Sequence, residues 1–496
     1  MDSVVFRQSA KGTVVTLIGA MIGFITTFFL VTLYLTPEEL GLTRVLVEVA
    51  TLIGGLALLA SQSSIVRYYP HFKTEDGADK GFLKWVLMIP ALGFILFTVL
   101  YFLLREPLVR YFSASDASGL FDSYFYLVVP LMAFIMYLTT FEVYASVKQR
   151  VAMPKLIREV VLRLLLLGSY LTYGLTHLSF RSFVWLFVLS YGLCVLLDLL
   201  YVTKINPTGL RARIAPVSRE IKQDFTKYTL FTVLSALGGT IVTRLDLFMV
   251  SSQMGFMYGG IYTIAFFIIA IIEMPARSLM SMSSPYVSAA LYEEDREHVA
   301  QIYRRVSHHQ LLAAMILFLL IWTNIDTLFA IIPNSEVYVQ GKWVVFVLGL
   351  ARMVDLTFNF GNTILRFSKY YPWTLAYTVI VTLLTILLNY YLIGVCGMEG
   401  AALSTLISFL ISNSFQQYIL TRKLGVTPID KELGQIFCIL GLLLLVEWGM
   451  PKSGLYALDS LWRTAVMVLV GWLLLRRLEV YKELQREVKA YISSLR

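Results

Sequence analysis

The sequence predicts an all-α membrane protein with about fourteen transmembrane helices. Its 496 residues are 58% hydrophobic and only 15% charged, whereas a soluble domain is about half apolar and a quarter charged. The apolar residues form long runs, and about 20 of them in a row are needed for a helix to cross a bilayer. The runs are continuous rather than alternating with polar residues, which argues against a membrane β-barrel.

The apolar runs define the expected spans. They lie near residues 13–35, 42–66, 82–104, 121–144, 157–176, 182–203, 226–252, 257–280, 308–331, 342–368, 372–395, 399–421, 433–450 and 459–478. Most of the 41 lysines and arginines fall in the N-terminal segment, the even-numbered loops and the C-terminal tail. Because positively charged loops stay in the cytoplasm, both termini are expected there, as an even number of spans requires.

A basic loop at 204–225 divides the first twelve spans into six and six. We therefore expect an N-lobe (1–203), this cytoplasmic linker, and a C-lobe (226–421), with spans 13–14 at 422–478 and a cytoplasmic tail at 479–496. Residues 217–227 could form an amphipathic helix at the membrane surface. Two equal lobes are the arrangement of a transporter with an internal repeat, which works by alternating access.

One hydrophilic stripe runs along the tenth expected span. Arg352, Asp355, Asn359, Asn362 and Arg366 follow one another by 3, 4, 3 and 4 residues. At about 100° per residue they fall within roughly 80° of one side of a helix. An ionised side chain near the bilayer centre costs about 2.5–3.5 kcal/mol, so this stripe cannot face lipid. We expect it to line a cavity, with architectural ion pairing as the alternative, and snorkelling as the alternative for Arg366.

Similar stripes occur on three other spans. Span 2 carries Arg44, Glu48, Thr51, Gly55 and Gln62, span 4 carries Pro130, Tyr137, Thr140 and Tyr144, and span 8 carries Tyr262, Glu273 and Arg277 beside Pro275. The stripes on spans 2, 4, 8 and 10 occupy matching positions in the two halves. This match favours one shared central cavity, although packing is the simpler explanation for the tyrosines of span 4.

Two carboxylates are candidates for an ion site. Asp355 lies three residues from Arg352, so the two can touch, and Asp355 would either position Arg352 or carry a coupling ion. Asp246 follows Arg244 by two residues and points away from it, so each needs a partner on another helix. Span 1 has no ionisable residue, which places any ion site in the second half.

Several other classes of function are excluded. The net charge of +9 lies in loops between spans and is no sign of nucleic-acid binding. The three cysteines lie in or beside apolar runs and the five histidines show no metal-ligand spacing, so neither a disulfide framework nor a metal site is expected. The loops are too short for a catalytic domain, and we expect no enzyme and no organic cofactor.

Residues 389–405 read Asn-Tyr-Tyr-Leu-Ile-Gly-Val-Cys-Gly-Met-Glu-Gly-Ala-Ala-Leu-Ser-Thr. This segment resembles the hairpin of Wzx-type polysaccharide (O-antigen) flippases of the MOP (multidrug/oligosaccharidyl-lipid/polysaccharide) exporter superfamily. Small residues at Gly397 and Gly400 would allow a tight turn and close approach of two helices. Gly394 stands where proline is usual in that family.

The resemblance implies two six-helix lobes that form a V around a central cavity, plus two extra C-terminal helices. It implies transfer of a polyisoprenyl-diphosphate-linked oligosaccharide across the cytoplasmic (inner) membrane of a bacterium by a monomer, with polysaccharide polymerase as a possible partner. Sodium in some relatives is bound in the second lobe, where Asp246, Asn389 and Thr405 could supply oxygens; coupling to Na⁺ or H⁺ is expected. The alternatives are a MATE-like multidrug or organic-cation antiporter and, further away, a membrane glycan polymerase or glycosyltransferase.

Overall fold

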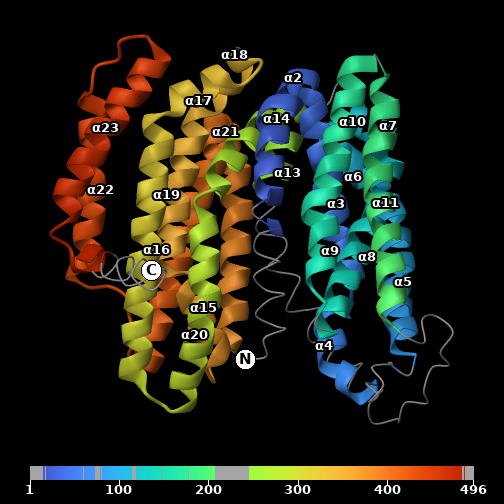
Figure 1. Cartoon of the computed structure of the whole chain (residues 1–496), viewed down its shortest axis with the longest axis horizontal. Helices are drawn as coiled ribbons and strands as arrows, with labels where there is room; N and C mark the ends of the chain where they lie inside the picture. Colours follow the sequence, from blue (N-terminus) through green and yellow to red (C-terminus); the bar gives the residue numbers. More distant parts are fainter. Residues whose placement is uncertain are drawn as a thin grey trace, which may run out of the picture. The chain divides into compact units, whose positions relative to one another are not determined.

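The computed structural model describes residues 15–16, 18–59, 61–72, 79, 81–113, 119–148, 150–176, 178–206, 245–482 and 485, and over these residues it is helical without strands (Figure 1). Nine of the described helices are long and apolar enough to cross a membrane, or ten if one bent pair counts as a span. The protein is therefore a multi-pass membrane protein. The count of fourteen is not confirmed, since most of the expected span 226–252 and the linker lie outside the described residues.

The chain forms two compact units, Met1–Gly260 and Ile261–Arg496. The helices of the first unit are η1 (Thr26–Val31), α2 (Thr32–Tyr34), α3 (Pro37–Ala57), α4 (Ser61–Phe72), α5 (Phe82–Leu103), α6 (Arg105–Ser113), α7 (Leu120–Tyr124), η2 (Phe125–Leu127), α8 (Val128–Val147), α9 (Ala152–Leu156), η3 (Ile157–Val161), α10 (Leu162–Thr176), α11 (Phe180–Ile205) and α13 (Leu245–Met254). Helix α14 (Phe256–Ala270) crosses the boundary between the units.

The second unit continues with α15 (Glu273–Tyr292), α16 (Arg296–Thr323), α17 (Ile325–Ile331), α18 (Ser335–Tyr338), η5 (Val339–Gly341), α19 (Lys342–Phe358), α20 (Phe360–Phe367), α21 (Pro372–Leu424), α22 (Lys431–Gly449) and α23 (Tyr456–Leu475). Several of the expected spans are interrupted, and two examples lie in different halves of the chain. The span at 42–66 is divided between α3 and α4, and the span at 257–280 bends by 54° between α14 and α15.

In the first unit, α3 begins with a complete capping box. Thr36 accepts from the backbone N–H of Glu39, Glu39 accepts from that of Thr36, and Pro37 takes the first helical position. The start of α3 lies directly against the start of α14, because a Cβ at Gly41 would lie 1.9 Å from the carbonyl oxygen of Phe256. The glycine that opens the expected second span is thus required by close packing.

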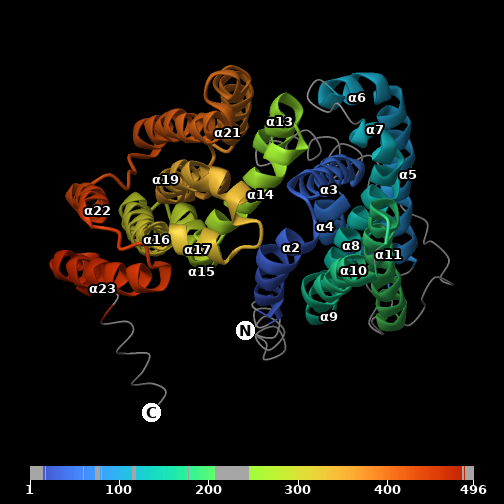
Figure 2. The same cartoon turned by 90° about the horizontal axis from the view of Figure 1, so that it is seen from above.

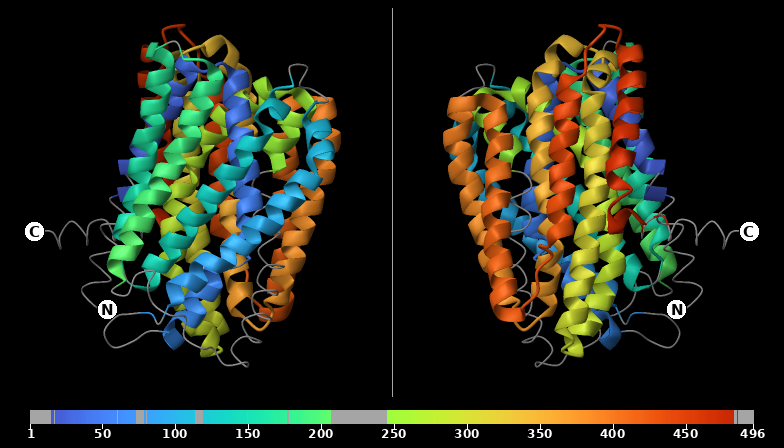
Figure 3. Two further views of the ribbon diagram at one scale, coloured as in Figure 1. Left: turned by 90° about the vertical axis from the view of Figure 1, so that its right-hand side faces the viewer. Right: turned by 90° about the vertical axis from the view of Figure 1, so that its left-hand side faces the viewer.

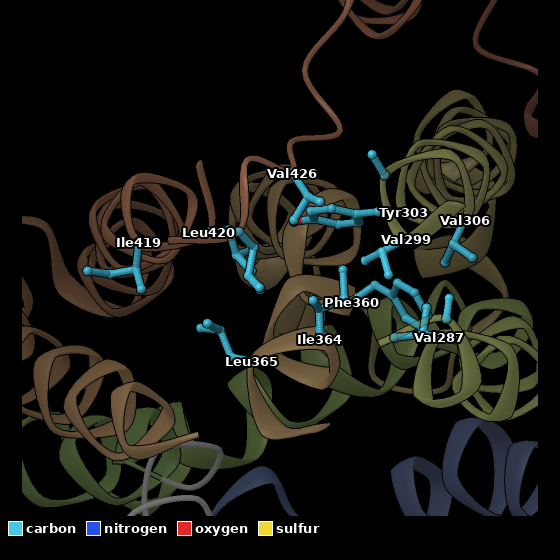
Figure 4. Packing of buried hydrophobic residues seen from close by; sticks show 13 residues of the cluster. Val287, Val299, Tyr303, Val306, Phe360, Ile364, Leu365, Ile419, Leu420 and Val426 are labelled. Atoms are coloured by element: carbon cyan, nitrogen blue, oxygen red, sulfur yellow. The ribbon is translucent and has the colours of Figure 1, made fainter. Parts of the chain in front are cut away.

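The core of the second unit lies between α15, α16, α20 and α21. Figure 4 shows Tyr303 of α16 and Phe360 of α20 among aliphatic residues such as Val287 and Leu420, all fully or nearly fully buried. Such packing of several helices on one another fixes the orientation of α20, which carries part of the predicted hydrophilic stripe.

Helices α22 and α23 pack on α16, beside which they lie in Figure 2. A buried ion pair joins Glu447 of α22 to Arg463 of α23, and the indole of Trp322 on α16 donates to the same carboxylate over 3.1 Å. Asp326 binds both Lys342 and Lys452. Burial raises the pKa of Asp326, but the two lysines outweigh this effect, so its pKa lies below the ordinary value. These contacts attach the extra helix pair to the second unit.

The turn predicted at Gly397 is confirmed. Helix α21 is two arms of a hairpin joined at Gly397, whose backbone has φ 64° and ψ −145°, and the arms run side by side as the orange helices of Figure 3. That region of backbone space is open almost only to glycine. The predicted close approach also holds at Gly400, where a Cβ would lie 2.0 Å from the carbonyl oxygen of Leu392.

We expect Gly397→Ala to destabilise the folded protein by about 1–3 kcal/mol, because alanine must adopt a strained backbone at the turn. Gly394→Ala is the matched control, since its added Cβ meets no atom within 4 Å and alanine favours the helix. Thermal unfolding of the two purified variants in the same detergent measures the difference. Equal midpoints for the two variants would show that the turn tolerates a side chain.

Candidate functional site

A carboxylate shared by two arginines lies at the start of α15. Glu273 Oε1 lies 3.0 Å from Nε of Arg352 on α19, and Glu273 Oε2 lies 2.9 Å from Nη2 of Arg277, one turn further along α15. The side chain of Arg352 is only 12% exposed, whereas that of Arg277 is 76% exposed. Three residues predicted as cavity residues from two different spans are thus brought together, and the group carries a net charge of about +1.

Within the described residues Arg352 and Asp355 form no ion pair, although the charge of Arg352 acts on the Asp355 carboxyl. Among the described residues, the ion pair of Arg352 is made with Glu273. The guanidinium also lies 5.5 Å from the ring centre of Phe266 and 5.7 Å from that of Phe409. The bend between α14 and α15 places Glu273 within reach, and two aromatic faces hold the cation in that direction. Glu273 thus makes the direct contact with Arg352, and the role of Asp355, as arginine positioner or coupling-ion carboxylate, stays a prediction.

Asp355 lies in a polar cluster beside this group, since the charges of Arg352 and Glu273 both act on its carboxyl. The side chains of Asn359 on its own helix and of Asn413 on α21 lie next to its carboxylate. The hydroxyl of Tyr377 donates to Asn413 Oδ1 over 3.3 Å. Within the described part of the chain, the buried amide oxygens of Asn359 and Asn362 have no hydrogen-bond partner. Carboxylate and amide oxygens are the ligands that a small hard cation prefers.

The stripe itself is interrupted, which the sequence did not predict. The expected single helix at 342–368 ends as α19 at Phe358 and resumes as α20 at Phe360. The N–H of Asn362 donates to the carbonyl of Asn359 over 3.0 Å. This bond spans three residues, as in a 3₁₀-helix, whereas the bonds of an α-helix span four. The break falls at Asn359, with Arg352 and Asp355 before it and Asn362 and Arg366 after it.

Side chains from two other helices satisfy the backbone at this break. The carbonyl of Phe358 accepts from the hydroxyl of Tyr303 over 3.0 Å and from Nε2 of Gln416 over 2.9 Å. A Cβ at Gly361 would lie 2.3 Å from Gln416 Nε2 and 2.6 Å from the Tyr303 hydroxyl, so only glycine leaves room for both donors. Gly361 was the one sequence signal of this arrangement.

The stripe of the first unit is held within its own helix. Arg44 Nη2 lies 2.8 Å from Glu48 Oε1 on α3, with Glu48 buried and Arg44 partly exposed. The hydroxyl of Thr51 donates to the carbonyl of Val47 over 2.6 Å. Gln62 lies half-buried on α4, beyond the interruption that follows α3. That this stripe and the one in the second unit line one cavity stays a prediction.

The remaining predicted residues are placed as follows. Arg366 is exposed at the end of α20. Asn389 and Thr405 are buried on opposite arms of the α21 hairpin, and Asp246 lies on α13 in the first unit. Arg244 lies outside the described residues. That Asp246, Asn389 and Thr405 form one ion site stays a prediction.

No family model matches the sequence, and no curated protein matches it significantly. Several solved transporters have a similar fold. The chain matches the Lipid II flippase MurJ in an inward closed conformation at a TM-score of 0.69 and 13% identity, over 94% of this chain and 98% of that one. An inward-facing multidrug resistance MATE family transporter of the MOP superfamily matches at a TM-score of 0.62 and 16% sequence identity. The match covers 82% of this chain and 94% of that one.

The third similar structure is a MOP superfamily transporter from Pyrococcus furiosus, described as having a binding pocket of reversed polarity. It matches at a TM-score of 0.52 and 14% identity, over 85% of this chain and 95% of that one. All three similar proteins are transporters rather than enzymes. The chain therefore has the fold that flippases and multidrug transporters of this superfamily share.

Proposed function

We propose that the protein is a flippase that moves a polyisoprenyl-diphosphate-linked oligosaccharide from the cytoplasmic to the outer leaflet of the cytoplasmic membrane. The observation that carries this proposal is the pair of arginines bridged by Glu273, on a fold shared with a Lipid II flippase. The glycan would be a unit of O-antigen, capsule or exopolysaccharide, and a polysaccharide polymerase is an expected partner.

Arginine is suited to the diphosphate. Its guanidinium is permanently charged and offers paired donors that match two phosphate oxygens. The ion pair of Arg352 uses Nε and that of Arg277 uses Nη2, so other nitrogens on each side chain remain for a ligand. The amides of Asn359 and Asn362, and in the first unit Thr51 and Gln62, would meet sugar hydroxyls, while the polyprenyl tail stays in lipid.

The competing proposal is export of organic cations, since the fold is also that of MATE family transporters. The carboxylate of Asp355 and its neighbouring amides are the feature that favours it. Cation export requires a site of net negative charge, whereas the bridged group of Glu273, Arg277 and Arg352 carries about +1.

Reconstitution in liposomes distinguishes the two functions. Fluorescent lipid-linked oligosaccharide is placed in one leaflet, and its transfer is scored by quenching from outside. Protein-free liposomes measure spontaneous transfer, and a fluorescent organic cation is the second substrate. Transfer of the cation without transfer of the lipid-linked sugar would reject the flippase proposal.

Alternating access by rocking of residues 1–203 against 226–421 yields a further prediction. Cysteine pairs placed near Gly41 on α3 and Tyr258 on α14, after replacement of the three native cysteines, should arrest transport when crosslinked. A reductant should restore it, and each single-cysteine variant is the control. Full transport by a completely crosslinked sample would rule out opening at the ends of these two helices.

A further inference from the structure

A buried acid in the first unit has no place in the function proposed above. Asp198 lies on α11, only 1% exposed, one turn from the buried Cys194 and one turn from the buried Val202. Its Oδ1 is buried and has no hydrogen-bond partner among the described residues. An ionised carboxylate in this state costs several kcal/mol unless it is paired.

Two charged groups on neighbouring elements act on Asp198, and they form an ion pair with each other. Glu142 on α8 and Arg158 on η3 are 2.7 Å apart, and both influence the Asp198 carboxyl. On its own helix, the titratable neighbours of Asp198 are Cys194 and Tyr201. The three charged groups thus comprise two carboxyls and one guanidinium.

Helix α10 also packs against α11, but its arginine is engaged elsewhere. Arg163 lies 2.9 Å from Glu159 and also donates to the carbonyl of Gly19. Arg158 itself lies on η3, a π-helical turn between α9 and α10. Single π-turns inside helices occur often at functional sites, where they redirect a side chain. Here the turn carries the side chain that pairs with Glu142.

We propose that Asp198, Glu142 and Arg158 form a proton-binding site inside the first unit. One guanidinium neutralises one carboxylate, so the cluster is neutral when Arg158 pairs with Glu142 and Asp198 holds a proton. Loss of the proton to water leaves the cluster with a charge of −1. The cluster reaches the protein surface through Glu142 and Arg158, whose side chains are 24% and 42% exposed.

A proton fits this cluster better than a metal ion. The guanidinium of Arg158 would repel a cation, and sodium would require several more oxygen ligands. Among the described residues, no group of three or more histidine, cysteine and acidic side chains is arranged to hold a metal. A protonatable residue inside a membrane protein is a functional site by default. The claim that this proton is coupled to transport rests on the proposed function. The claim that the site binds a proton does not.

Infrared difference spectra of the purified protein, recorded between acidic and alkaline pH, test proton binding without any substrate. The wild type should show the C=O band of a buried protonated carboxylic acid, and Asp198→Asn should lose it. In Glu142→Gln, Arg158 has Asp198 as its one remaining carboxylate in the cluster. The pH at which half of the band is lost should therefore fall by about one to three units. Glu447→Gln is the control: it removes a buried acid already paired with Arg463 and Trp322, and the band should persist.

A band that persists unchanged in Asp198→Asn, or a midpoint that does not move in Glu142→Gln, would overturn the site. The role in coupling is measured separately in liposomes with lipid-linked oligosaccharide. A pH gradient should accelerate transfer by the wild type and not by Asp198→Asn, while transfer without a gradient continues in both. If the band behaves as expected but no protein transfers the sugar, the proton site stands and the proposed function fails.

Discussion

Arg352→Lys is expected to lower transfer of lipid-linked oligosaccharide by about 10- to 100-fold with normal insertion into the membrane. Lysine keeps the charge but loses the planar fork that would bind a diphosphate and that lies over the rings of Phe266 and Phe409. Loss of a charge-assisted hydrogen bond costs about 1.5–3 kcal/mol, and every 1.4 kcal/mol is about tenfold. Initial rates of transfer at several substrate concentrations, in liposomes with equal protein content, measure the effect.

Arg422→Lys is the matched control for this experiment. Arg422 lies exposed at the end of α21, where its guanidinium stacks on Tyr418 at 5.6 Å from the ring centre. The chemical change is the same, but the side chain belongs to no candidate site, so transfer should stay at the wild-type rate. A wild-type rate for Arg352→Lys as well would mean that the bridged arginines are architectural.

Helical spacing alone identified the stripe residues but not their partners. Apolar runs predict the membrane helices, and steps of three and four place Arg352, Asp355 and Asn359 on one side. The partner of Arg352 depends on how α15 packs against α19, which no spacing along one helix encodes. The pair of Arg44 and Glu48, by contrast, lies four residues apart on one helix and could be read from the sequence.

The same limit applies to the two least expected features. The break in the stripe depends on Tyr303 and Gln416, which are 55 and 58 residues from Phe358 along the chain. The cluster at Asp198 assembles from α8, η3 and α11, so no spacing along α11 indicates its other two members. Interactions between distant residues, rather than local propensity, decide both features.

Asp355→Asn is expected to bind the lipid-linked oligosaccharide normally and to lose the acceleration that a sodium gradient gives. Because Glu273 rather than Asp355 holds Arg352, removing the charge of Asp355 leaves the arginines in place. The variant keeps the size of the side chain and removes the carboxylate that, with the amide oxygens of Asn359 and Asn362, would bind a coupling cation. Transfer is measured with a sodium gradient, with a proton gradient and with neither.

Glu273→Gln is the matched comparison and should behave in the opposite way. It frees Arg277 and Arg352 from the carboxylate that competes with the substrate, so the apparent affinity for the substrate should rise about tenfold. The response to the gradient should survive. The arginines would then recognise the diphosphate, and the carboxylate of Asp355 would couple transport to sodium. Loss of the gradient response in Glu273→Gln, together with its retention in Asp355→Asn, would exchange the two roles and make Glu273 the ion-binding carboxylate.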